Sequence, residues 1–260
     1  MKKNIKIIIF ILSLFLVFII YKIFSNENEK IIYVPLGDSI AEGMTPYHNI
    51  DYGYTDYIKD YLNRKNKLSF YTKKYTKSGY TIQDITNDIN NNKIIEENGN
   101  KIYLKEILRE SDLVTLTVGA NNFIKGLNID DISSKILDME STKKEIDSIL
   151  NEYKNLLVLL KKYAKNQIIV TGYFNPFQRQ DLYKKEVDEI VKYFNYEVES
   201  ICEELGIIYI DIFDILNNKD FFPNPVDIHP NKTGYKLISE NIIKMIDGWQ
   251  IIKNCVYYFR

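Results

Sequence analysis

The sequence contains few of the residue types that define several common protein classes. Among 260 residues there are only 2 cysteines, 11 glycines and 6 prolines, which excludes a disulfide-rich scaffold, a four-thiolate zinc site and a collagen-like repeat. There is no excess of charge either, because 34 Lys and Arg residues oppose 35 Asp and Glu residues. Since a sequence-independent nucleic-acid binder needs a positive excess, the charge balance argues against that class.

Histidine is just as scarce, with His48 and His229 as its 2 occurrences. A mechanism that needs an imidazole must therefore use one of them. Two histidines far apart, with no acidic calcium-binding loop, leave no ligand set, so we expect no metal. Cys202 lies in a predicted helix and Cys255 in the C-terminal tail. We interpret them as one buried and one incidental thiol, with a single disulfide as the alternative.

Apolar residues, by contrast, are plentiful. The chain is 45% hydrophobic and 13% aromatic, enough to bury a full core and to exclude global disorder. The length suits one large domain or two small ones. Because neither an internal repeat nor a linker rich in Pro, Gly or Ser divides the chain, we predict a single domain over residues 31–250.

The N-terminus carries a separate signal. Three lysines precede an apolar run from Ile7 to Tyr21 that only Ser13 interrupts. With its apolar flanks this run approaches the ~20 residues that span a bilayer, so residues 1–25 are predicted to be a signal anchor and residues 26–30 a polar tether. The lysine asymmetry places the bulk of the chain outside the cytoplasm. Secretion after cleavage is the alternative, although no small-x-small cleavage site follows.

Short apolar runs alternate with segments of helical periodicity from Lys30 onward. The apolar runs predict five strands: Ile31–Leu36, Leu68–Thr76, Leu113–Val118, Ile168–Gly172 and Ile207–Ile210. The periodic segments predict helices: Tyr54–Arg64, Thr81–Asn90, Lys143–Lys165, Asp181–Leu205 and Thr233–Asp247. This alternation predicts an α/β fold with a mostly parallel sheet that helices cover on both faces.

Three segments do not fit that alternation. Asn90–Gly99 and Lys125–Ser141 are polar and irregular, and we expect insertions or lid-like loops there. The tail over residues 251–260 has no clear assignment.

Polar residues follow several of the predicted strands where each one ends. The segments are Gly37–Ile40, Ser78–Tyr80, Gly119–Asn122 and, beyond a longer loop, Asp227–Asn231. In an open parallel sheet the carboxyl ends of the strands meet at one edge, where helix N-termini point toward a ligand. The sequence therefore predicts one site built from all four segments.

These residue types suit nucleophilic catalysis. A serine hydroxyl needs a base to take its proton, and Ser39 at a strand-to-helix turn has His229 as its candidate base. The Asn121 amide and the backbone N–H of Gly79 are candidate donors to a developing oxyanion. We interpret His48, which follows the serine turn, as a loop or substrate-cleft residue.

The blocks GDSI, SGYT, GANN and DIHPN together resemble the GDSL/SGNH-type lipase and acylhydrolase superfamily, membrane-anchored bacterial members in particular. The resemblance implies a three-layer α/β/α, flavodoxin-like fold with a five-stranded sheet. It also implies a nucleophile at Ser39, a base at His229 and oxyanion donors at Ser39 N–H, Gly79 N–H and the Asn121 amide. Such enzymes cleave carboxylic esters or thioesters, or transfer acyl groups, without a metal or organic cofactor.

The sequence departs from the family pattern at two positions. Ile40 replaces the usual leucine, a conservative change in packing. The usual place of the acid, three residues before the histidine, is Val226, so Asp227 is the nearby carboxylate that can orient the His229 ring. The alternative is a Ser–His dyad oriented by a backbone carbonyl or water. We assign Asn122 a structural role.

Three functions remain open on this evidence. The first is a membrane-anchored, extracytoplasmic serine esterase or lipase acting on an ester-containing small molecule, a lipid or an acylated glycan. The second is an O-acetyl esterase or acyltransferase acting on cell-surface glycan with the same residues. The third, from a different class, is a catalytically silent surface-binding module that kept the fold.

Overall fold

The centre of the fold is a five-stranded parallel sheet with the order β2-β1-β5-β6-β7. The computed structural model describes Ser13, Phe15 and residues 30–126, 139–175 and 184–256. The strands are β1 (Ile31–Gly37), β2 (Leu68–Tyr71), β5 (Leu113–Thr117), β6 (Gln167–Thr171) and β7 (Ile208–Ile210). The predicted α/β fold with five parallel strands is confirmed.

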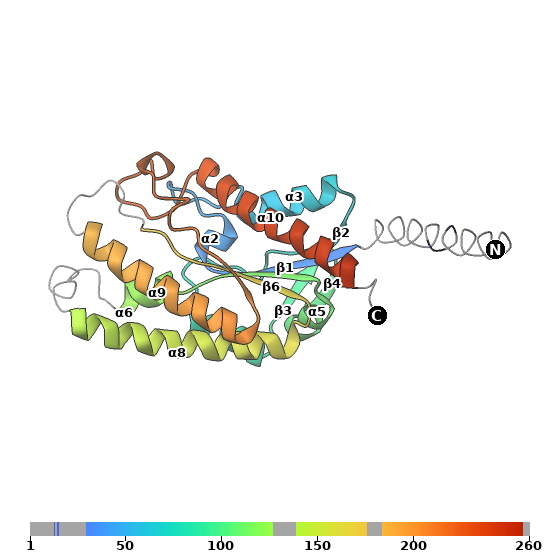
Figure 1. The fold of residues 1–260 in the computed structure, drawn as a ribbon, viewed down its shortest axis with the longest axis horizontal. Coiled ribbons are helices and arrows are strands. Elements are labelled where there is room, and N and C mark those ends of the chain that lie inside the picture. The colour runs from blue at the N-terminus through green and yellow to red at the C-terminus, as the bar shows by residue number, and fades with distance from the viewer. Residues whose placement is uncertain (1–12, 14, 16–29, 127–138, 176–183, 257–260) are drawn as a thin grey trace, which may run out of the picture.

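Helices cover both faces of this sheet (Figure 1). One face is covered by α3 (Tyr54–Arg64) and α10 (Lys232–Val256). The other is covered by α4 (Ile82–Asn90), α5 (Leu104–Glu110), α8 (Met139–Tyr163) and α9 (Lys184–Leu205). The layers give the three-layer α/β/α arrangement that the sequence predicts.

The core consists of two apolar clusters, one on each face of the sheet. Successive residues of one strand enter different clusters: Leu113 packs with α3 and α10, while Val114 packs with α4 and α8. The side chains of a strand alternate between faces, and both faces are buried here. This double burial is why β1, β5 and β6 are nearly continuous apolar runs in the sequence.

Several element boundaries differ from the prediction. β2 ends at Tyr71 rather than Thr76, because the chain turns where Thr76 N donates to Lys73 O at 2.9 Å. Helix α10 does not end at Asp247 but continues to Val256, so part of the unassigned tail is helical. The predicted start of α9 at Asp181 lies outside the described residues.

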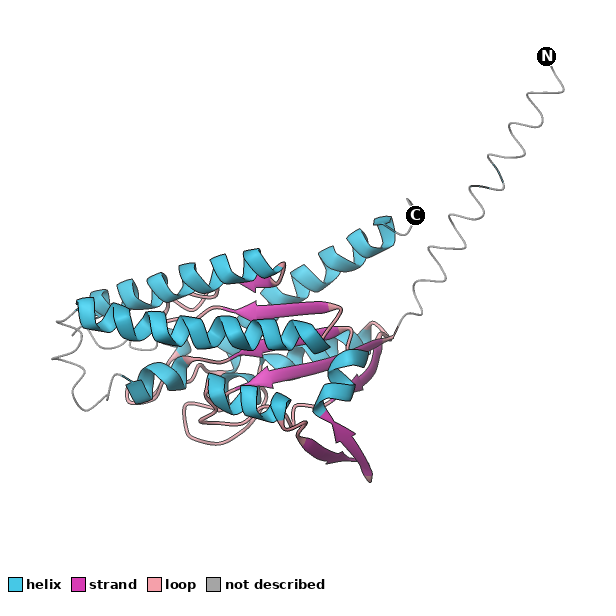
Figure 2. Ribbon diagram, turned by 90° about the horizontal axis from the view of Figure 1, so that it is seen from below, coloured by secondary structure: helices cyan, strands magenta, loops and turns pink. Residues whose placement is uncertain are grey.

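The polar segment Asn90–Gly99 is not a lid-like loop. Its second half forms, with the residues that follow, an antiparallel hairpin of β3 (Ile94–Glu97) and β4 (Asn100–Tyr103), separate from the main sheet (Figure 2). Asn98 and Gly99 have φ values of 51° and 78°, which is the left-handed conformation that an Asn-Gly hairpin turn requires. Of the two alternatives, an insertion fits this hairpin, whereas a lid-like loop is wrong, because the polar Asn-Gly pair is a hairpin-turn signal and not a sign of irregular structure.

Other predicted segments fall largely outside the described residues. These are the signal anchor at residues 1–25, the tether at residues 26–30 and most of the loop predicted over Lys125–Ser141. In the part of the chain that the structure describes, no helix combines the length and the apolar character that a membrane span requires.

Candidate active site

The site begins at a sharp turn between β1 and the short helix α2 (Ser39–Glu42). Gly37 has a φ of 150°, and a Cβ at this position would lie 2.3 Å from the carbonyl oxygen of Thr117. Only glycine therefore allows β1 to lie this close to the end of β5. Asp38 caps α2, because its Oδ1 accepts a hydrogen bond from Ile40 N at 3.0 Å. The turn holds Ser39 at the carboxyl edge of the sheet.

A continuous chain of hydrogen bonds joins Ser39, His229 and Asp227. Ser39 Oγ lies 2.8 Å from His229 Nε2, and His229 Nδ1 lies 2.9 Å from Asp227 Oδ1. A carboxylate only accepts, so Nδ1 carries the proton and the serine hydroxyl donates to Nε2. All three residues are buried, with exposed fractions of 7–8%. The structure thus brings together two segments that are 190 residues apart in sequence.

Asp227 also holds the backbone of His229. Its Oδ1 accepts from His229 N at 2.8 Å as well as contacting the ring, so one oxygen orients both the main chain and the imidazole. Val226, at the position where the family usually has its acid, is 85% exposed. A local turn of two residues therefore brings Asp227 to the ring.

The environment of His229 favours its neutral form. Burial lowers the pKa of His229 below its usual value near 6.5, because little water reaches the ring to solvate the cation that protonation would create. The negative charge of Asp227 opposes this shift, and the neighbouring His48 adds to it. The lowered pKa keeps Nε2 free to accept a proton at neutral pH.

The two predicted side-chain and backbone oxyanion donors, Asn121 and Gly79, lie on segments that a hydrogen bond joins. Asn121, in α6 (Ala120–Gly126), uses one amide hydrogen to donate from Nδ2 to Tyr80 O at 2.8 Å, which fixes the amide and leaves its second hydrogen. Gly79 has a φ of 82°, and a Cβ there would meet nothing within 4 Å. Its backbone conformation, rather than crowding, is what favours glycine. Among the described residues, no backbone hydrogen bond takes up the N–H of Ser39 or Gly79.

Asn122 has the structural role that the sequence suggests. Its Oδ1 accepts a hydrogen bond from Ile82 N at 3.0 Å, at the first residue of α4. An orphan N–H at the start of that helix is thereby satisfied.

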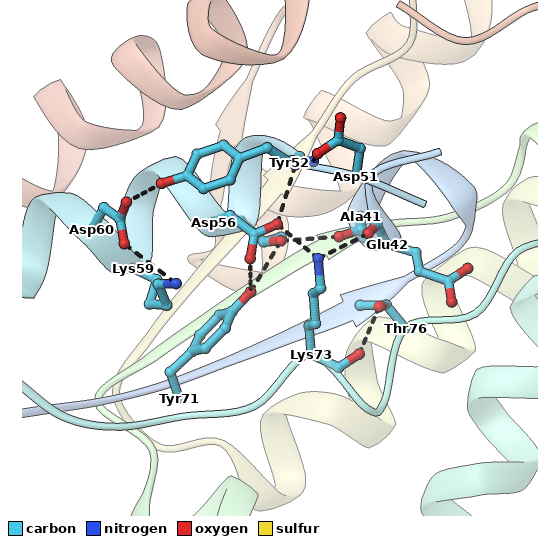
Figure 3. Close-up of polar contacts among 12 residues, drawn as sticks. Ala41, Glu42, Asp51, Tyr52, Asp56, Lys59, Asp60, Tyr71, Lys73 and Thr76 are labelled. Carbon is cyan, nitrogen blue, oxygen red and sulfur yellow. Dashed lines mark hydrogen bonds and ion pairs between the residues drawn. The ribbon is translucent and has the colours of Figure 1, made fainter. Parts of the chain in front are cut away.

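A polar brace that the sequence did not indicate ties the Gly79 loop to α2. The carboxylate of Glu42 accepts from both Ser78 N, at 2.6 Å, and Ser78 Oγ, at 2.5 Å. Behind it, Lys73 Nζ donates to Glu42 O at 3.2 Å and to Asp56 Oδ2 at 2.7 Å (Figure 3). No motif marks these residues, because their contacts depend on the packing of three separate segments.

Two further titratable groups lie at the site. Asp38 is only 1% exposed, and burial raises its pKa to about 7. Within the described part of the chain, its Oδ2 has no hydrogen-bond partner. His48 lies on the far side of Asp227, with its Nε2 3.5 Å from Asp227 Oδ2. In residues 30–126, 139–175 and 184–256, no group of three His, Cys, Asp or Glu side chains is placed to hold a metal ion.

Serine hydrolases have a serine that is hydrogen-bonded to an imidazole, which in turn is hydrogen-bonded to a carboxylate. Ser39, His229 and Asp227 have this arrangement. Here it lies at the carboxyl edge of a parallel sheet, where α/β enzymes place their chemistry. Residues 36–237 match the GDSL-like lipase/acylhydrolase family. The chain belongs to this family of ester hydrolases.

Several proteins are similar to this chain in sequence or in fold. The uncharacterized protein YpmR of Bacillus subtilis is 21% identical over 227 residues, which cover 85% of this chain and 84% of YpmR. A lipase from a goat rumen metagenome has a TM-score of 0.63 at 18% identity, over 83% of this chain and 97% of its own. Axe2, an acetylxylan esterase from Geobacillus stearothermophilus, has a TM-score of 0.56 at 17% identity, over 84% and 95%. At these identities the two solved structures establish a common fold.

Proposed function

We propose that this protein is a serine hydrolase that cleaves carboxylic esters or thioesters through an acyl intermediate on Ser39. The observation that carries the proposal is the buried chain from Ser39 Oγ through His229 to Asp227, with distances of 2.8 and 2.9 Å. The lowered pKa of His229 supplies a neutral base for the serine proton.

In the first step, Ser39 Oγ bonds to the ester carbonyl carbon while its proton passes to His229 Nε2. The carbonyl oxygen becomes an anion, which the N–H groups of Ser39 and Gly79 and the second amide hydrogen of Asn121 stabilise. When this intermediate collapses, the bond to the alcohol breaks and His229 returns the proton to the leaving oxygen. Water then repeats the sequence, releasing the acid and restoring the serine.

We assign Asp227 the role of the acid in a Ser39–His229–Asp227 catalytic triad. It keeps the proton of His229 on Nδ1, so that Nε2 faces the serine, and it stabilises the imidazolium that forms. Structures of Axe2 include catalytic mutants that replace a serine, an aspartate or a histidine by alanine. Those are the residue types that the chain described here supplies.

A second candidate is an O-acetyl esterase or acyltransferase acting on cell-surface glycan. The shared fold of Axe2, an acetylxylan esterase, favours it, and the same three residues would act. In the transferase, a sugar hydroxyl replaces water in the second step. Both candidates fit a chain whose residues 1–25 anchor it to the membrane with the catalytic domain outside the cytoplasm.

The decisive comparison uses p-nitrophenyl acetate and the Ser39→Ala variant of the full chain in detergent. We expect the variant to lose at least about 10⁴-fold in kcat. Equal release of p-nitrophenol by both proteins would instead favour the silent binding module. Adding an unacylated glycan to the assay, with mass spectrometry of the product, separates acyl transfer from hydrolysis.

A further inference from the structure

The loop that follows α2 is clamped to the loop that carries the base. Residues 43–53 form the first loop, and residues 222–231 form the second and lead into α10. Besides the contact of His48 with Asp227, three polar contacts join these regions: Asn224 Nδ2 to Pro46 O at 2.7 Å, Tyr235 Oη to Met44 O at 2.6 Å, and Lys232 Nζ to Asp51 Oδ2 at 2.8 Å. His48 is therefore held beside the base-carrying loop from both ends of its own loop.

The backbone of His48 is itself constrained. It has a φ of 61°, a left-handed conformation in which histidine and asparagine are over-represented. Its N–H donates to Thr45 O at 3.1 Å, and Thr45 Oγ1 donates to Asn49 Oδ1 at 2.5 Å. These bonds close a tight turn, and this turn aims an otherwise exposed imidazole at Asp227.

The two oxygens of Asp227 are divided between the two histidines of the chain. Oδ1 contacts His229 Nδ1 at 2.9 Å, and Oδ2 lies 3.5 Å from His48 Nε2. The Asp227 side chain is 3% exposed, whereas that of His48 is 72% exposed. One buried carboxylate thus faces a buried imidazole on one side and a solvated imidazole on the other.

We propose that His48 is a positioning residue of the Asp227–His229 pair, which lies against the outer oxygen of Asp227 and helps to keep His229 in its neutral form. This inference rests on the proposed function, in which His229 is the base. At 3.5 Å the contact acts through charge, because that length is too great for a strong hydrogen bond. A proton on His48 neutralises part of the negative charge of Asp227 and repels a second proton on His229.

As a consequence, His229 stays neutral to a lower pH than it would without His48. His48 lowers the pKa of His229, in the same direction as burial and against Asp227. The other charged groups on these segments are Asp51 and Lys232, which pair with each other at 2.8 Å, and the buried Asp38 beside Ser39. Since Asp51 and Lys232 carry opposite charges, their field at the imidazoles largely cancels.

The test uses the fact that the chain has only 2 histidines. In the full chain in detergent, with ¹³C-labelled histidine, NMR follows two imidazole signals through a pH titration. The variant His48→Asn keeps a residue that tolerates the left-handed backbone and removes the second imidazole. We expect it to raise the pKa of His229 by about 0.2 to 0.7 units, the range for a partly exposed charge pair.

Two companion variants make the result specific. His48→Lys keeps a positive charge, so it should leave the His229 titration at or below its wild-type position. Thr45→Val removes the hydroxyl bond of the turn that aims His48 at Asp227, so it should raise the pKa of His229 in the same direction as His48→Asn but by a smaller amount. An unchanged His229 titration in His48→Asn, or the same upward shift in His48→Asn and His48→Lys, would overturn the proposal.

The kinetic readout separates this inference from the proposed function. In His48→Asn, the acidic limb of the pH profile of kcat/KM should shift to higher pH by the same amount as the NMR titration. Ser39→Ala should abolish turnover at every pH. Absence of Ser39-dependent turnover in the wild type would refute the proposed function, yet the NMR result would still decide whether the two histidines are coupled.

Discussion

At the scale of single residues, burial shifts the pKa values of two groups at the site, His229 and Asp38. His229 is neutral because solvent is excluded from its ring, and Asp38 keeps a proton up to about pH 7 for the same reason. The carboxylate of Asp227 is also buried, but it has partners on both of its oxygens. Two aspartates near one serine therefore have different environments, and only one of them contacts the base.

The variant Asp227→Asn tests the third residue of the site. An amide can offer its oxygen or its NH₂ group to the ring, so Nδ1 is no longer forced to carry the proton, and the imidazolium loses its counter-charge. We expect kcat/KM to fall by about 10³- to 10⁴-fold, with the fold intact by circular dichroism. A loss of less than about tenfold would favour the Ser–His dyad.

At the scale of secondary-structure elements, the short helix α2 and the Gly79 loop position the residues of the site. Helix α2 has only 4 residues, yet it carries the proposed nucleophile, Ser39, at its start and, at its end, the Glu42 carboxylate that accepts from Ser78 in the Gly79 loop. Two hydrogen bonds from Ser78 thus tie the loop to the helix. An oxyanion donor must stay in place to within a fraction of an ångström, so this connection matters for rate.

Glu42→Ala should therefore reduce kcat more than it changes KM. Without the carboxylate, Ser78 loses both hydrogen bonds that fix the loop, and the Gly79 N–H is no longer held in place to donate to the oxyanion. We therefore expect kcat to fall by about 10- to 100-fold. Ser78→Ala, which keeps the backbone donor, should give a smaller loss. Steady-state kinetics measures both, and Glu106→Gln on the surface of α5 serves as a control without effect. An unchanged kcat in Glu42→Ala, or a change in its KM as large as the change in its kcat, would contradict this role.

At the scale of the whole molecule, the buried carboxyl of Asp38 lowers the free energy of unfolding at neutral and higher pH. Its pKa is about 7 in the folded chain and near 3.8 when exposed. Because the folded pKa is raised, the folded state gains relative stability below pH 3.8 and loses it as pH rises through 7. The free energy of unfolding of Asp38→Asn, minus that of the wild type, should therefore increase between pH 4 and pH 8.

We expect this increase to reach up to about 4 kcal/mol. Urea unfolding of the full chain in detergent at several pH values measures it. Groups that both proteins share cancel in the difference, so a difference that does not vary with pH would show that Asp38 stays ionised in the folded chain.

The organisation of the whole molecule could be predicted to a large extent from local patterns. Strands buried on both faces are apolar without interruption, and amphipathic helices carry their period in the sequence, so the α/β alternation was readable. The boundaries of the elements were harder to predict: β2 ends at Tyr71, before the predicted end at Thr76, because the chain turns at Lys73–Thr76. The β3–β4 hairpin was missed although Asn98-Gly99 is a local signal.

The amino-acid sequence by itself determined the parallel α/β plan and placed Ser39, Gly79, Asn121 and His229 after strands, because burial and turn chemistry act on neighbouring residues. Only the tertiary structure decided that Asp227 reaches the ring, that Glu42 holds Ser78 and that His48 faces the outer oxygen of Asp227. The contacts of His48 and Glu42 join separate loops, and that of Asp227 depends on a turn whose shape follows from its packing. These loops contact one another because the folded sheet brings them to the same edge. The conformational preferences of neighbouring residues do not determine which loops meet there.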